Sequence, residues 1–183
     1  SVVALGSIAA AYRFLRNRSM GTEASAAGRG KPKIGVVVQR FGTEVIGGAE
    51  RLAMQLAEGL SGRYDVEVLT TRARDYRQWA NEYPEGVVTQ GGLLVRRFHV
   101  SRPRPWRAFG WISSALFALN RKRLVPNWLS RIWVSLQGPC VPDLIAFLRT
   151  HRKRYGAVIF FTYLYYPTVR GLPLIGRRAI LVP

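Results

Sequence analysis

The residues of this sequence that could do chemistry gather around one pair of glycines. Gly47 and Gly48 follow an apolar run and precede an amphipathic one. There they would present two unobstructed backbone N–H groups at the start of a helix, whose dipole favours an anion. The pair therefore predicts a phosphate-binding turn, although Gly-Gly also makes an ordinary strand-to-helix turn. Glu50 falls in the first turn of the same helix, where a carboxylate either stabilises the dipole or lies near a substrate.

The usual nucleotide-binding and metal-binding signatures are missing. Neither G-x-G-x-x-G nor G-x-x-x-x-G-K-[ST] occurs, which argues against a dehydrogenase and a P-loop NTPase. Asp65 and Glu67 have the spacing of an Asp-x-Asp metal motif, but they lie at the start of a predicted strand, away from the edge where ligands bind. His99 and His151 have no partners at ligand spacing, and the single Cys140 excludes a disulfide framework. We therefore expect no metal site, no cofactor and no complete acid–base pair.

Strand and helix patterns alternate from Lys33 onward. Apolar residues at helical spacing predict a helix over 47–60 and several within 105–153. The polar, turn-rich stretch 71–92 is predicted to be a surface loop. Continuous apolar runs, which are typical of strands buried on both faces, predict strands at 34–38, 66–70, 93–100, 157–163 and 179–182.

This alternation predicts an α/β fold, a Rossmann-like parallel sheet flanked by helices in one layered domain over 33–183. In such sheets ligands bind beyond the carboxyl ends of the strands. Thr162, Tyr163 and Tyr165 follow the fourth predicted strand, so we expect them at that edge, where aromatic faces suit sugar or lipid stacking. Core packing is the alternative explanation for the aromatic residues of this strand.

Residues 1–32 form an extension of different composition. A short apolar stretch is followed by three arginines and then by a Gly/Ala/Ser-rich segment. The apolar part is too short to span a bilayer. It is either the end of a signal anchor or a segment that precedes a true start at Met20. Because the chain begins with Ser1 and stops at Pro183 directly after an apolar run, we expect it to be a fragment of a longer protein.

The formal net charge of +18 is concentrated in the second half of the chain. Residues 86–183 contain a single acidic residue, Asp143. Such a basic half indicates phosphate, nucleic acid or anionic lipid as a partner. Arginine accounts for 24 of the 28 basic residues, however, and nucleotide composition alone can produce that skew.

Four of the five tryptophans fall within residues 106–133, together with several basic residues. Tryptophan prefers the membrane interface, and basic residues are attracted to anionic lipid. The candidate contact residues are Trp111, Arg121, Lys122, Arg123 and Trp128. They predict a cytoplasmic protein that contacts the inner face of the membrane peripherally. The alternative is that the tryptophans pack on the sheet while the basic residues solvate the outer face.

Several segments resemble the N-terminal domain of the family-4 retaining glycosyltransferases of GT-B fold. The resemblance covers about residues 33–183, and its most specific part is the Gly-Gly-Ala-Glu segment that begins at Gly47. The segments that carry it are Lys33-Ile-Gly-Val-Val-Val38, Ile46-Gly-Gly-Ala-Glu-Arg51, Leu56-Ala-Glu-Gly-Leu60, Tyr64-Asp-Val-Glu-Val-Leu-Thr70, Gly92-Leu-Leu-Val-Arg-Arg-Phe98 and Arg178-Ala-Ile-Leu-Val-Pro183.

The resemblance implies one half of an enzyme that moves a hexosyl sugar from a nucleotide-diphosphate-sugar to a glycan, lipid-linked or small-molecule acceptor. On this view Gly47 and Gly48 approach the donor phosphates. The candidates for binding the acceptor are Phe41, Glu50, Thr162, Tyr163 and Tyr165. The family's donor-binding half, with its Glu-x7-Glu motif, is not in this sequence, so the chain alone is expected to be inactive.

The alternative from another functional class is a basic nucleic-acid-binding α/β module. It rests on the charge of residues 86–183. The sequence has no zinc finger, RNA-recognition signature or convincing helix-turn-helix. We therefore expect no nucleic-acid partner.

Overall fold

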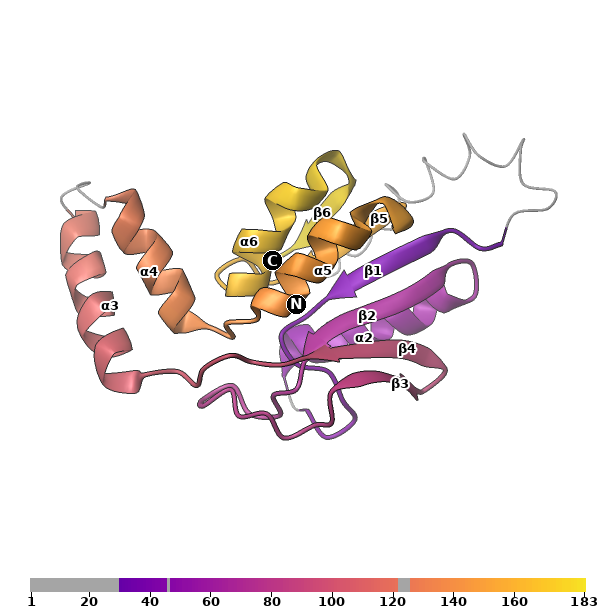
Figure 1. Cartoon of the computed structure of the whole chain (residues 1–183), viewed down its shortest axis with the longest axis horizontal. Helices are drawn as coiled ribbons and strands as arrows, with labels where there is room; N and C mark the ends of the chain where they lie inside the picture. The colour runs from indigo at the N-terminus through magenta and orange to yellow at the C-terminus, as the bar shows by residue number, and fades with distance from the viewer. Residues whose placement is uncertain (1–29, 46, 122–125) are drawn as a thin grey trace.

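A computed structural model of the protein describes residues 30–45, 47–121 and 126–183 (Figure 1). The described strands form one sheet in the order β3-β4-β2-β1-β5-β6. All neighbouring strands are parallel except β3 and β4, which form an antiparallel pair. The strands are β1 (Lys33–Val37), β2 (Asp65–Thr71), β3 (Gly86–Gln90), β4 (Leu93–Phe98), β5 (Ala157–Phe161) and β6 (Ala179–Val182).

Helices cover both faces of this sheet. Helix α2 packs on one face, whereas α5 and α6 pack on the other (Figure 1). The predicted α/β fold with a helix-flanked, Rossmann-like sheet is therefore confirmed, but the sheet is only mostly parallel, because β3 and β4 are antiparallel. The helices are α2 (Gly48–Ser61), α3 (Trp106–Arg121), α4 (Asn127–Gln137), α5 (Pro142–His151) and α6 (Tyr166–Ile175), and short 3-10 turns span Arg152–Arg154 and Gly176–Arg178.

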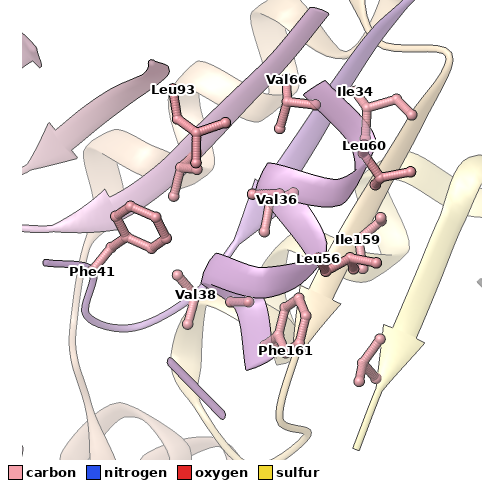
Figure 2. Close-up of a cluster of buried hydrophobic side chains, with 14 of the residues drawn as sticks. Ile34, Val36, Val38, Phe41, Leu56, Leu60, Val66, Leu93, Ile159 and Phe161 are labelled. Atoms are coloured by element: carbon pink, nitrogen blue, oxygen red, sulfur yellow. The ribbon is translucent and has the colours of Figure 1, made fainter. Parts of the chain in front are cut away.

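The core beneath α2 fixes where that helix begins. Leu56 and Leu60 lie over Ile34 and Val36 of β1 and over Ile159 of β5 (Figure 2). All five side chains are at most 2% exposed. Truncating such a leucine to alanine costs about 2–5 kcal/mol. This packing holds the first turn of α2 beside the carboxyl end of β1.

Strand β1 is the point at which the order of the sheet reverses. It pairs in parallel with β2 on one side, Val37 opposite Leu69, and with β5 on the other, Val37 opposite Phe160. The chain runs outward from β1 through β2 to the edge strand β3, places β4 between β3 and β2, and later returns to add β5 and β6 on the opposite side of β1. In open α/β sheets this switch point leaves a crevice at the carboxyl ends of the strands.

The prediction of a surface loop over 71–92 is wrong for part of that stretch. Residues Gly86–Gln90 form β3, and Trp79 is only 2% exposed. Strand β3 lies at the edge of the sheet, so its side chains alternate in burial and its sequence is partly polar. The predicted strand 157–163 ends two residues early, at Phe161, because Thr162 takes a left-handed conformation with φ 62°.

Helices α3 and α4 form a hairpin that stands away from the sheet (Figure 1). They pack through the rings of Phe109 and Trp133, whose centroids are 5.8 Å apart, and the Trp133 indole N–H donates to Ser113 Oγ at 2.9 Å. Trp111 is 83% exposed and Trp128 is 62% exposed. Trp106 is 49% exposed and meets Phe109, and Trp133 packs inside the hairpin. The alternative that the tryptophans pack on the sheet is therefore wrong.

Other parts of the predicted membrane contact cannot be placed. The side chain of Arg121, together with Lys122, Arg123 and residues 1–29, lies outside the described part of the chain. Among the helices that are described, none has the length and apolar character needed to cross a membrane.

Candidate functional site

A pocket of about 240 Å³ opens at the switch point. It lies beyond the carboxyl ends of β1 and β5 and beside the first turn of α2, which is the place where parallel sheets bind ligands. We call it the switch-point pocket. Its lining residues are Gln39, Arg40, Gly48, Ala49, Glu50, Tyr76, Trp79, Thr162 and Tyr165.

Gln39 and Thr162 join the two strand ends at this pocket. The Gln39 side-chain amide donates to Thr162 Oγ1 at 2.6 Å and to the Phe161 carbonyl at 3.0 Å. The Thr162 N–H donates to the Val182 carbonyl at 2.8 Å. These bonds hold a β-branched residue at positive φ, a conformation that costs about 1–3 kcal/mol and that clusters at functional sites.

The first turn of α2 forms a second wall of the pocket. Gly48, Ala49 and Glu50 line it, and no side chain caps the helix at Gly47. The N–H groups of an uncapped first turn carry the positive end of the helix dipole. A Cβ atom built on Gly48 would meet nothing within 4 Å. This wall therefore leaves room for a ligand to approach the backbone closely.

Glu50 pairs with Arg40 across this turn. Arg40 donates from Nη2 at 2.6 Å and from Nε at 2.9 Å to the same carboxylate oxygen, and its Nη1 donates to the Arg74 carbonyl at 3.2 Å. Arg40 is 7% exposed, and its guanidinium lies 5.4 Å from the centre of the Tyr76 ring. Because the pair neutralises both side chains, the dipole of α2 is left to attract an anion.

The ion pair leaves no room for a side chain at Gly47. A Cβ atom there would lie 2.8 Å from Glu50 Cδ and 3.1 Å from Arg40 Nη2, and it would overlap the Glu50 carboxylate. Its φ of −175° is extended backbone that any residue adopts. The need for glycine at this position is therefore steric, whereas the neighbouring Gly48 position is open.

Aromatic rings form the remaining wall. The rings of Trp79 and Tyr165 meet edge to face, with centroids 5.7 Å apart. The Trp79 indole N–H donates to the Gln137 carbonyl at 3.1 Å, which fixes the ring. Tyr76 is 47% exposed. The rings of Tyr76 and Tyr165 are therefore the accessible ones that suit the C–H faces of a sugar, whereas the buried Trp79 ring supports Tyr165 from behind.

The structure brings some of the predicted site residues together and separates others. Gly48, Glu50, Thr162 and Tyr165 line the switch-point pocket, and Gly47 lies directly behind Glu50. Phe41 and Tyr163 are not brought to it. Phe41 is 1% exposed within the core under α2, and Tyr163 is 57% exposed outside the lining.

Five lining residues were not predicted, namely Gln39, Arg40, Ala49, Tyr76 and Trp79. The first two directly follow a buried strand, so their position at its carboxyl end was a usable signal. For Trp79 the signal was a large apolar side chain within an otherwise polar stretch, since tryptophan is highly buried on average. Tyr76 is exposed and offered no such signal.

Glu67 is satisfied by side chains rather than left free to bind a metal. It accepts hydrogen bonds from the Tyr155 hydroxyl and Arg96 Nε, both at 2.8 Å, and pairs with Lys33 at 3.2 Å. Burial alone would raise the pKa of Glu67, but the hydrogen bonds from Tyr155, Arg96 and Lys33 outweigh it and lower that pKa. Burial and the adjacent Glu67 carboxylate raise the pKa of Tyr155.

The other candidates for chemistry take structural positions. Nδ1 of His151 lies 3.0 Å from the Phe147 carbonyl, and Nδ1 of His99 lies 3.4 Å from Arg72. Cys140 is a buried free thiol. Within the described residues, no three His, Cys, Asp or Glu side chains are grouped so that they could hold a metal ion.

No family model, curated protein or solved structure matches this chain. Function is therefore inferred from the geometry of the switch-point pocket. That geometry is an uncapped helix start, a glycine with open space before it and an aromatic wall, all meeting at the switch point of a mostly parallel sheet.

Proposed function

We propose that this chain is the acceptor-binding half of a GT-B glycosyltransferase, which moves a sugar from a nucleotide-diphosphate-sugar to a hydroxyl on a glycan or lipid-linked acceptor. The observation that carries the proposal is the switch-point pocket. It combines a helix start suited to phosphate with an aromatic wall suited to a sugar ring. The resemblance of residues 33–183 to family-4 enzymes supports the same function.

The residues of the pocket favour binding over chemistry. Glu50 is the single carboxylate among its lining residues, and Arg40 already pairs with it. One of its carboxylate oxygens already accepts two hydrogen bonds from Arg40, so Glu50 is poorly placed to take a proton from a substrate. The backbone N–H groups of the first turn of α2 would stabilise charge on the donor diphosphate. Thr162 and the ring of Tyr165 would orient the acceptor, and the buried Trp79 would hold the Tyr165 ring in place.

The test compares two valine substitutions at opposite ends of α2. Gly48→Val adds a side chain to the first turn of α2, where Gly48 lines the pocket. Gly62→Val is the matched control, because a Cβ atom there also meets nothing within 4 Å and its φ is −61°. Binding of uridine, guanosine and adenosine diphosphates to each folded protein is measured by calorimetry. We expect at least a tenfold loss of diphosphate affinity for Gly48→Val and none for Gly62→Val.

We expect the two variants to differ in diphosphate affinity but not in folding. Valine is slightly better than glycine in a helix, so both variants should keep the circular dichroism and unfolding midpoint of the parent protein. A folded Gly48→Val protein with unchanged affinity for the diphosphate that the parent binds would refute the phosphate-binding role.

A further inference from the structure

A second pocket lies at the base of the α3–α4 hairpin, between α4 and α6. It has a volume of about 330 Å³, and most of the side chains that line it are exposed to solvent. We call it the arginine pocket, because three of its lining residues are arginines from separate parts of the chain. The lining residues are Arg102, Arg131, Ile132, Ser135, Leu136 and Arg170.

These three arginines have no carboxylate partner among the described residues, in contrast to four other arginines of the chain. Arg40, Arg72, Arg74 and Arg96 pair with Glu50, Glu85, Glu44 and Glu67 respectively. Among the described residues, no Asp or Glu pairs with an arginine of the pocket. Three cations thus line one hollow without an internal counter-charge, and each guanidinium presents a planar set of donors that matches phosphate oxygens.

Exposed apolar side chains continue from the arginine pocket along α4. Trp128, Arg131, Ile132 and Ser135 are spaced by three and four residues, so they share one face of the helix. Trp128 is 62% exposed and Ile132 is 41% exposed. An anion-binding hollow beside exposed tryptophan and isoleucine is the combination that membrane interfaces favour, where charge meets headgroups and aromatic rings sit among them.

We propose that the arginine pocket binds the phosphate of an anionic phospholipid at the bilayer surface, while Trp128 and Ile132 enter the headgroup region. A soluble phosphate would leave this apolar face in water, and a nucleic-acid backbone would leave Ile132 without a partner. The proposal rests on the pocket and the face of α4 alone. It holds whether or not the switch-point pocket serves sugar transfer.

The test measures binding of the 183-residue chain to vesicles by co-sedimentation. Vesicles of phosphatidylcholine with and without one third phosphatidic acid are compared at low and high salt. The variant is the pair Arg131→Ala with Arg170→Ala. The control is the pair Arg51→Ala with Arg63→Ala, which removes the same charge from exposed positions on and just after α2, the helix that covers the opposite face of the sheet. Trp128→Ala tests the apolar face.

We expect the parent to bind the anionic vesicles and to be released by high salt. The pocket pair should weaken binding about thirtyfold, or about fivefold for each arginine, and the control pair no more than about threefold. Trp128→Ala should weaken it as well. Because the replaced side chains are exposed, we expect every variant to fold. Circular dichroism checks this.

Four results would overturn the proposal. The first is absence of binding to anionic vesicles. The second is equal weakening by the two arginine pairs, which would indicate general charge attraction. The third is arginine-dependent binding of inorganic phosphate or glycerol 3-phosphate without vesicle binding. The fourth is arginine-dependent binding of a single-stranded oligonucleotide without vesicle binding, which would favour a nucleic-acid partner.

Discussion

Replacing Gly47 with alanine and replacing Gly48 with alanine should change stability in opposite directions, although the two glycines are adjacent. A Cβ atom at Gly47 would lie 2.8 Å from Glu50 Cδ and 3.1 Å from Arg40 Nη2, so the ion pair must move. A Cβ atom at Gly48 would meet nothing within 4 Å. The same added methyl group therefore displaces a buried ion pair at one position and extends into open space at the next.

The magnitudes follow from the burial of the pair. The side chains of Arg40 and Glu50 are 9% and 11% exposed, so water screens them little. Fully removing one partner of a buried pair costs about 3–5 kcal/mol. The Glu50 carboxylate is the end of a flexible side chain and can shift, so we expect Gly47→Ala to cost about 2 kcal/mol. Gly48→Ala should stabilise the protein by about 0.5 kcal/mol through higher helix propensity.

Urea unfolding followed by circular dichroism measures the change in unfolding free energy for both glycine substitutions. The comparison requires that the variants have equal m-values. A double-mutant cycle with Glu50→Ala identifies the cause. If Gly47→Ala acts through the carboxylate, it should cost under about 0.5 kcal/mol once Glu50 is alanine. Equal effects of the two glycine substitutions, or a full cost of Gly47→Ala in the Glu50→Ala background, would refute the reasoning.

Three further predictions concern catalysis and pH. The chain alone should transfer no sugar from radiolabelled nucleotide-sugars, because Glu50 is already paired and the pocket lining holds no other carboxylate; product formation by the purified chain would contradict this. Because the pKa of Glu67 is lowered on folding, its contribution to stability is present above about pH 4.5 and is lost as the pH falls through the folded value. Glu67→Gln should therefore lower stability at pH 7 and flatten the acid limb of urea midpoints measured from pH 3 to 7. Because the pKa of Tyr155 is raised, its contribution is present below about pH 10 and is lost at higher pH. Tyr155→Phe should thus flatten the alkaline limb, and an alkaline limb like that of the parent would count against the buried hydroxyl.

The local pattern of apolar residues was sufficient to predict the central strands and α2. The apolar run that begins at Ile34 forms β1, and Leu56 and Leu60 are buried at the helical spacing that predicted them. The glycine pair also marks the helix start correctly, since α2 begins at Gly48. These features depend on contacts that any buried strand or amphipathic helix makes, so the period of the pattern reveals them.

Predictions from the local sequence pattern failed where the burial of a side chain depends on residues far away in the sequence. Trp79 is buried because it meets Tyr165 and donates to Gln137, residues that follow it by more than 50 positions. Nothing in its own polar neighbourhood indicates those contacts. Phe41 shows the opposite error. It was predicted to bind the acceptor, but its side chain is buried in the core under α2. The sequence located the edge of the sheet that carries the pocket, whereas the residues that close it came from tertiary contacts.

The Gln137 carbonyl connects the two pockets through the base of the hairpin. It accepts hydrogen bonds from the Trp79 indole at 3.1 Å and from Arg104 at 3.0 and 2.7 Å. Gly138, at φ 72°, follows it so closely that a Cβ atom there would lie 3.0 Å from the Trp79 ring. The end of α4, the segment before α3 and the aromatic wall of the switch-point pocket are therefore joined at one carbonyl. A shift of α4 against the sheet would therefore have to break these bonds or carry Trp79 with it.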